Sequence, residues 1–188
     1  MSPEYCDLFN SYIEKQKKDK QPSTIDKLYK NDRAFRYKFL AIYAPLHIPE
    51  MIQLLNSCIY EQKDGKRTIS ERGEYKVEKL INIFMKRAHY VLNQERYVEA
   101  ASIAFAVIFS IEQDMCHVYD KGINYQEIIE KTFYFLATLA NHNYNLETSV
   151  ALIYIANKLL EEINEDERLY DEEWRDAIIA LGKFNSLE

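Results

Sequence analysis

Hydrophobic residues recur every three or four positions along much of this chain, which is the spacing of an α-helical face. Residues 74–93 carry one apolar face at this spacing, and residues 124–141 carry another. These faces consist of Val77, Leu80, Ile81, Phe84, Ala88, Val91 and Leu92 in the first segment, and of Tyr125, Ile128, Ile129, Thr132, Leu136, Leu139 and Ala140 in the second. Both segments are predicted to be helices that are buried on one side.

Two other segments, residues 96–117 and 146–163, are apolar on nearly every side, unlike an ordinary surface helix. The first contains an uncharged run from Ala100 to Ile111, which as a helix is about 18 Å long and too short to cross a bilayer. Such helices need neighbours on several sides. Because they alternate with the one-sided helices through short turns, we expect stacked antiparallel hairpins.

The rest of the chain also reads as helical. Pro3, Ser23 and Pro49 stand at positions typical of helix starts, and Asn31-Asp32 is a candidate interruption. The further predicted helices cover residues 2–18, 23–43 and 49–62, with a last helix that bears Trp174, Ala177, Ile178, Leu181 and Phe184; "KDGKRTISERGE" is predicted to be a loop. With four glycines, four prolines and no convincing strand pattern, the chain is predicted to be all-α. We expect seven or eight helices in one domain, residues 1–188, divisible into N-terminal helices (1–63) and hairpin repeats (70–186).

The two hairpins resemble each other. Ala88 matches Ala137 at an offset of 49 residues, and Ala106 matches Ala156 at an offset of 50. Small residues at such points let helices approach closely. The similarity has two explanations, a true repeat and the pattern that any two helical hairpins share.

The stretch "AHYVLNQERYVEAASIAFAVI" resembles a tetratricopeptide hairpin, with Ala88, Tyr97 and Ala100 at that family's spacing. The hairpin period near 49 residues is longer than the family's period of about 34, and Ala88 and Glu95 stand at its glycine positions. The resemblance implies a superhelix of helical pairs.

Residues 70–184 resemble the helical region that follows the SWIM zinc finger in some bacterial proteins. The similar elements are "LNQERYVEAASIAF", the acidic glycine-containing loop "VYDKGINYQEII" and the helix "DEEWRDAIIAL". The finger itself is absent because the chain has no CxC, so its nucleic-acid role does not transfer. The final Leu187-Glu188 is a common cloning remnant, which would make the chain a piece of a longer bacterial protein.

The charge distribution is uneven around a net charge of −6, which makes the whole chain a poor phosphate-backbone binder. Residues 14–38 have a net charge of +5 and residues 161–188 a net charge of −7. These segments are either solvated helical faces or a partner-docking site at one end. We expect neither a nucleic acid nor a membrane as a direct partner.

The cysteines do not predict a disulfide framework, since Cys6, Cys58 and Cys116 are odd in number and widely spaced. The start of the chain lacks the layout of a signal peptide. A reducing, cytoplasmic location is therefore expected.

No catalytic or metal-binding constellation stands out. The histidines, His47, His89, His117 and His142, are scattered over different helices and loops, and HExxH is absent. Cys116-His117 could ligate a metal, but it also fits the end of a helix. The acids of "EEINEDERLYDEE" read as a solvated face. We expect no enzyme activity and no cofactor.

The leading hypothesis is a non-catalytic helical-repeat module that binds another protein or another domain of its own parent chain. A structural, self-associating domain is the first alternative, and an enzyme with an unrecognised helical-bundle site is the second. In tetratricopeptide-like stacks, the first helix of each hairpin lines the concave, ligand-binding surface. Placing that geometry on the Ala88 and Ala137 matches predicts a protein-binding surface made of Asn82, His89, Asn93, Lys131, Tyr134, Thr138, Asn141 and His142.

Overall fold

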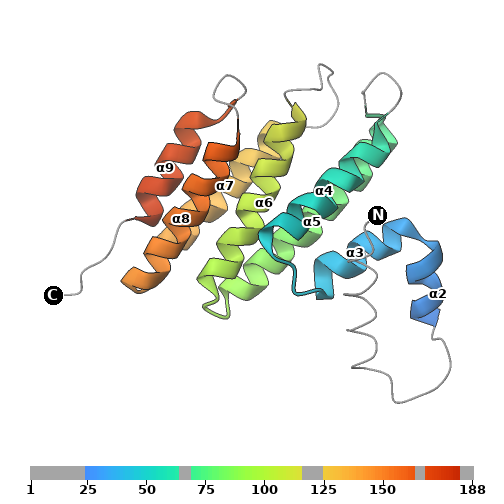
Figure 1. The fold of residues 1–188 in the computed structure, drawn as a ribbon, viewed down its shortest axis with the longest axis horizontal. Coiled ribbons are helices and arrows are strands. Elements are labelled where there is room, and N and C mark those ends of the chain that lie inside the picture. Colours follow the sequence, from blue (N-terminus) through green and yellow to red (C-terminus); the bar gives the residue numbers. More distant parts are fainter. Residues whose placement is uncertain (1–23, 64–68, 116–124, 164–167, 183–188) are drawn as a thin grey trace, which may run out of the picture. The chain divides into compact units, whose positions relative to one another are not determined.

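A computed structural model describes residues 24–63, 69–115, 125–163 and 168–182, and this part of the chain is all-helical, as predicted (Figure 1). The helices are α2 (Thr24–Asn31), α3 (Arg33–Tyr43), α4 (Ile48–Gln62), α5 (Glu71–Leu92), α6 (Tyr97–Met115), α7 (Tyr125–Ala140), α8 (Leu146–Glu162) and α9 (Asp171–Leu181). One isolated β-bridge joins Lys63 to Ile69. The predicted helix over residues 2–18, the start at Ser23 and the contribution of Phe184 lie outside the described residues.

The chain divides into two compact units, Met1–Leu46 and His47–Glu188. In the first unit, α2 ends where α3 begins because Asp32 caps α3: its carboxylate accepts the backbone N–H of Phe35 at 3.0 Å. Arg36 then joins the two helices, since its guanidinium donates to the Tyr29 carbonyl at 2.8 Å. The predicted interruption at Asn31-Asp32 is therefore confirmed.

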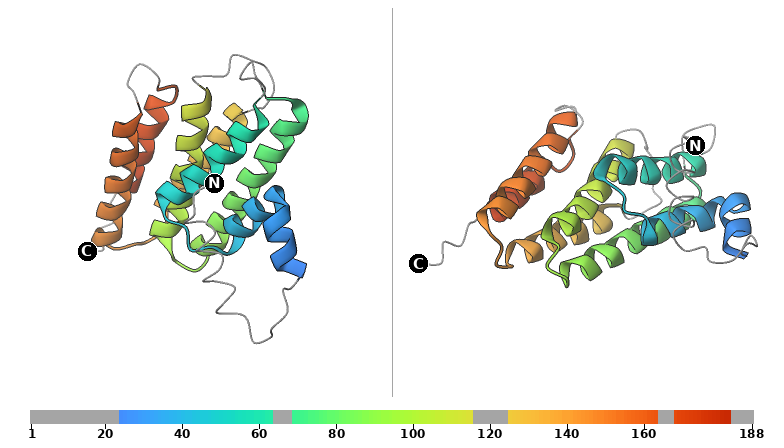
Figure 2. Two further views of the ribbon diagram at one scale, coloured as in Figure 1. Left: turned by 45° about the vertical axis from the view of Figure 1, so that its right-hand side comes forward. Right: turned by 60° about the horizontal axis from the view of Figure 1, so that its bottom comes forward.

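The second unit has two layers of helices. Helices α4, α6 and α8 lie side by side in one layer, and α5 and α7 lie behind them (Figure 1). Helix α9 packs against both α7 and α8 at one end of the unit. The two turned views show the same arrangement (Figure 2). As a result, α6 packs against α4, α5, α7 and α8, and its Phe105 ring also reaches Trp174 of α9.

Helix α6 is the centre of the core. Every residue from Ala100 to Ile111 is buried, as the uncharged sequence predicted, and Glu112 is buried as well. The Phe105 ring stacks on the indole of Trp174 in α9 at 5.6 Å between centroids. The all-round apolar character of this helix is thus explained by its neighbours.

Helix α5 begins earlier than predicted. The hydroxyl of Ser70 accepts the backbone N–H of Gly73 at 3.2 Å, and this cap takes the end of "KDGKRTISERGE" into the helix. The predicted apolar face of α5, from Val77 to Leu92, is buried throughout. Its C-terminal end leads directly into α6 through a turn in which Glu95 adopts a φ of 60°.

The inferred alanine matches do not all occupy equivalent places. Ala88, Ala106 and Ala156 are completely buried, but Ala137 is exposed on α7. The prediction that Ala137 lets two helices approach closely is therefore wrong. The sequence match at this position does not correspond to a shared packing role, because α7 packs through Leu136 and Leu139 on its other side.

Candidate functional site

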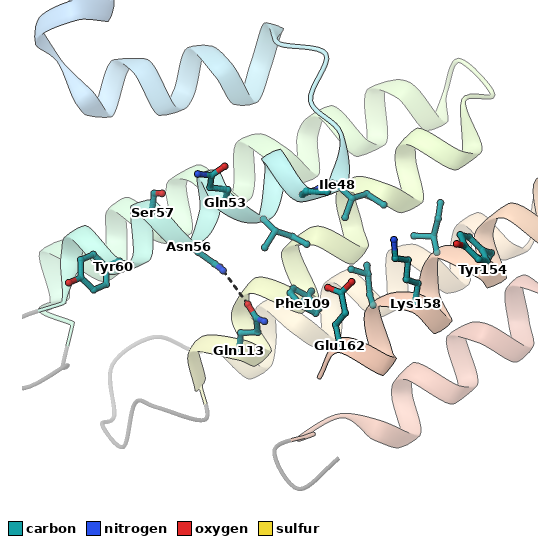
Figure 3. Close-up of a pocket in the computed structure, with 14 residues that line it drawn as sticks. Ile48, Gln53, Asn56, Ser57, Tyr60, Phe109, Gln113, Tyr154, Lys158 and Glu162 are labelled. Atoms are coloured by element: carbon teal, nitrogen blue, oxygen red, sulfur yellow. Dashed lines mark hydrogen bonds between the residues drawn. The ribbon is translucent and has the colours of Figure 1, made fainter. Parts of the chain in front are cut away.

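An open groove of about 730 Å³ runs between α4 and α8, with α6 as its floor (Figure 3). Its size is within the range of ligand-binding clefts. The lining is mainly apolar and comes from Ile48, Pro49, Ile52, Gln53, Asn56, Ser57 and Tyr60 of α4, Phe109 and Gln113 of α6, and Tyr154, Ile155, Lys158, Leu159 and Glu162 of α8.

The α4 wall follows from how this helix begins and packs. Pro49 lies in the first turn, and the backbone N–H of His47 donates to the carboxylate of Glu50, so the helix starts at the groove. One face of α4 is buried, while Ile48 and Ile52 are only half-buried. These two isoleucines give the groove an apolar wall that remains accessible.

The polar groups of the groove are neutral amides, the hydroxyls of Ser57, Tyr60 and Tyr154, and one pair of opposite charges. The Asn56 amide donates to the Gln113 side-chain oxygen at 3.2 Å, which joins the α4 wall to the floor (Figure 3). Lys158 and Glu162 stand one helical turn apart on the α8 wall. This set can position a ligand by hydrogen bonds and charge.

The sequence predicted that α8 has neighbouring helices on several sides, and this prediction is wrong. Ser149, Leu152, Ala156 and Leu159 form the buried face. On the solvent side, Leu146, Val150 and Tyr154 are 57%, 56% and 66% exposed. They recur every four residues, so they form an apolar stripe along the helix that ends at the groove. We call these three residues the α8 stripe.

A buried carboxylate that was not singled out from the sequence lies behind the groove floor. Glu112 accepts the backbone N–H groups of Leu169 and Tyr170 at 3.0 and 3.2 Å, and the indole N–H of Trp174 at 2.6 Å. All three of these hydrogen-bond donors lie in the first turn of α9 or just before it. Its role is therefore structural, and no local sequence signal links residues so far apart.

Burial raises the pKa of the Cys58 thiol to about 11, with a smaller contribution from the nearby Glu61 carboxylate. A thiol that remains protonated is a poor nucleophile. Cys116-His117, the candidate metal pair, lies outside the described residues. Within the described segments, no three His, Cys, Asp or Glu side chains are grouped so that they could hold a metal ion.

The eight side chains predicted to bind a partner are all exposed, and they lie on or just after α5 and α7. Some have local roles: the backbone of Asn93 caps the end of α5, and the Thr138 hydroxyl donates to the Tyr134 carbonyl. His89 packs its ring against Phe135 at 4.7 Å. None of the eight lines the groove, which belongs to the other layer. Their contact with a partner stays a prediction.

The groove went unrecognised in the sequence because its walls come from α4 and α8, which are far apart in the chain. Exposed apolar positions on α8 were the available signal, but the same pattern also fits a fully buried helix.

Comparisons with protein-family models, curated proteins and solved structures found no match. In the described part of the chain, every helix is too short or too polar to pass through a bilayer.

Proposed function

We propose that this chain is a non-catalytic helical module that binds another protein, or another domain of a longer parent chain, through the groove and the adjoining α8 stripe. The observation that carries the proposal is the exposure of Leu146, Val150 and Tyr154 next to an open apolar groove. Contiguous exposed apolar surface of this kind is typical of interaction sites.

The fitting partner is an amphipathic helix. Helical grooves commonly receive such a helix through apolar side chains spaced three and four residues apart. Ile52 and Ile155 on the two walls, with Phe109 between them, offer contacts to its apolar face. The amides of Gln53 and Gln113 and the charges of Lys158 and Glu162 can serve the polar edges of the same helix.

Photo-crosslinking tests which layer meets a partner. A benzoylphenylalanine replaces Tyr154 at the groove in one variant and Tyr134 on α7 in a control variant. Both tyrosines are well exposed, at 66% and 76%, so the two probes differ mainly in the layer that they report. The proposal expects a hetero-adduct from position 154 in native lysate and none, or far less, from position 134.

The captured protein is then purified, and its binding is measured by titration. Ile155→Asp should weaken binding by tenfold or more, because it places a charge in the apolar groove. Tyr134→Asp should leave the affinity unchanged. Adducts from position 134 alone would instead favour the predicted surface on α5 and α7. Adducts of the chain with itself at position 154 would favour the self-associating alternative.

A further inference from the structure

The outward face of α5 concentrates positive charge. Arg72, Lys76, Lys79 and Lys86 are exposed and, at about 100° of turn per residue, point to the same side of this helix. Tyr75 lies among them and Tyr90 one turn beyond Lys86 on the same side, and these rings are 61% and 64% exposed. We call these six residues the α5 stripe.

The Lys76 ammonium at the edge of this stripe has a neutral partner, since it donates to the Gln62 side-chain oxygen of α4 at 3.1 Å. Glu78 is exposed on α5 but points about 100° away from Lys79 around the helix axis. The remaining base of α5, Arg87, turns inward and pairs with Glu99 at 3.1 Å. Among the described residues, no carboxylate forms an ion pair with any of the four exposed bases of the stripe.

The stripe is long and interleaved. From Arg72 to Tyr90 it extends about 27 Å along the helix. The Lys79 ammonium lies 5.6 Å from the Tyr75 ring centroid, so a cation and an aromatic face are presented together. Asn82 and Asn93 are exposed towards the same side and offer amide donors and acceptors.

We propose that the α5 stripe binds single-stranded nucleic acid. Its cations contact successive phosphates, and Tyr75 and Tyr90 stack on unpaired bases, which is how sequence-tolerant single-strand sites combine charge and aromatic rings. A duplex would not offer free base faces to these rings. An anionic membrane fits less well, because the exposed side of the stripe lacks the Leu, Phe and Trp residues that insert into lipid.

The net charge of −6 does not oppose this site. At physiological salt, charges are screened over about 8 Å, so a phosphate at the stripe responds mainly to the four nearby bases. The stripe belongs to the α5 layer and the groove to the α4, α6 and α8 layer. The inference is therefore independent of the proposed protein-binding groove.

Fluorescence polarisation with the full chain and a labelled uridine oligonucleotide of about 15 nucleotides tests the proposal at about 50 and 200 mM salt. If three or four phosphates are contacted, the logarithm of the affinity should fall with the logarithm of salt with a slope of about −2 to −3. Lys76→Glu/Lys79→Glu should weaken binding at least tenfold. The control Lys27→Glu/Lys30→Glu changes the net charge equally, on two exposed lysines of α2, and should change affinity less than twofold.

Replacing the two tyrosines distinguishes a site for nucleic acid from a site that binds any polyanion. Tyr75→Ala/Tyr90→Ala should weaken oligonucleotide binding at least fivefold and leave the salt slope unchanged, since stacking releases no counterions. A duplex of equal length, polyglutamate and anionic vesicles should bind more weakly than the single strand. The proposal is overturned if no binding occurs at about 100 µM protein in low salt, if both lysine pairs act alike, or if the tyrosine variant binds normally.

Discussion

The carboxylate of Glu112 in α6 and the indole N–H of Trp174 in α9 form a buried hydrogen bond of 2.6 Å, across 62 residues of sequence. The other oxygen of this carboxylate accepts two backbone N–H groups just before α9. The negative charge is thus placed near the positive end of the α9 dipole. One side chain of the central helix fixes both the start of α9 and the orientation of its tryptophan.

Removing this carboxylate should loosen α9. We expect Glu112→Ala to lower the free energy of unfolding by about 3 kcal/mol, because three N–H groups lose a charged acceptor. Glu112→Gln keeps one acceptor oxygen and should cost less, about 1–2 kcal/mol. Urea unfolding followed by the emission of Trp174, the single tryptophan, measures both values. A loss below about 0.5 kcal/mol for the alanine variant would contradict the described network.

Truncating the centre of the core should be costly. Phe105 is fully buried and stacked on Trp174, so Phe105→Ala is expected to lower the free energy of unfolding by about 3–5 kcal/mol. Tyr134→Ala removes an equally large but exposed ring and should cost less than about 0.5 kcal/mol. Chemical denaturation of both variants provides the comparison. If Phe105→Ala costs less than about 1 kcal/mol, α6 does not lie at the centre.

The Cys58 thiol should make stability fall at alkaline pH. Its folded pKa of about 11 is higher than the ordinary value of 9.0, so the unfolded chain releases this proton first as the pH rises. Between about pH 8 and 10.5, this should remove about 2 kcal/mol of stability. Other groups titrate in the same range. The quantity to measure is therefore the free energy of unfolding of the natural chain minus that of Cys58→Ala. This difference should become smaller as the pH rises. An unchanging difference would show that the thiol titrates normally.

Replacing Gly73 by alanine should destabilise the protein, although this substitution usually stabilises a helix. A Cβ at this position would lie 2.9 Å from the Gln62 Cβ and 2.9 Å from the Ile69 Cγ2, closer than ordinary contacts. Gly73→Ala should therefore lower the melting temperature, although alanine is preferred to glycine in a helix by about 1 kcal/mol. Gly182→Ala is the matched control, since its nearest side-chain neighbour is the flexible end of Ile153 at 3.2 Å. Thermal unfolding by circular dichroism would reveal an error if Gly73→Ala melts at a higher temperature.

The sequence predicted the helices and the burial of α6 on several sides, because apolar periodicity directly reports which faces are buried. It could not predict the number of neighbours that a helix finds. The segments that became α6 and α8 look alike, yet Phe105 is enclosed and Tyr154 is exposed. The groove and the Glu112 network were also beyond local patterns, since each joins residues that are more than 50 positions apart.

The packing of α6 between helices of both layers also bears on shortened versions of this protein. A chain that stopped before α8, or one that began after α4, would leave one side of Ala100–Ile111 in water. An uncharged segment of this length, with three isoleucines, two phenylalanines and a valine, is prone to aggregate once it is uncovered. Premature termination or cleavage within this unit should therefore yield insoluble products that cells degrade. Loss and gain of single hairpins would be an unfavourable route for this protein to change its length during evolution.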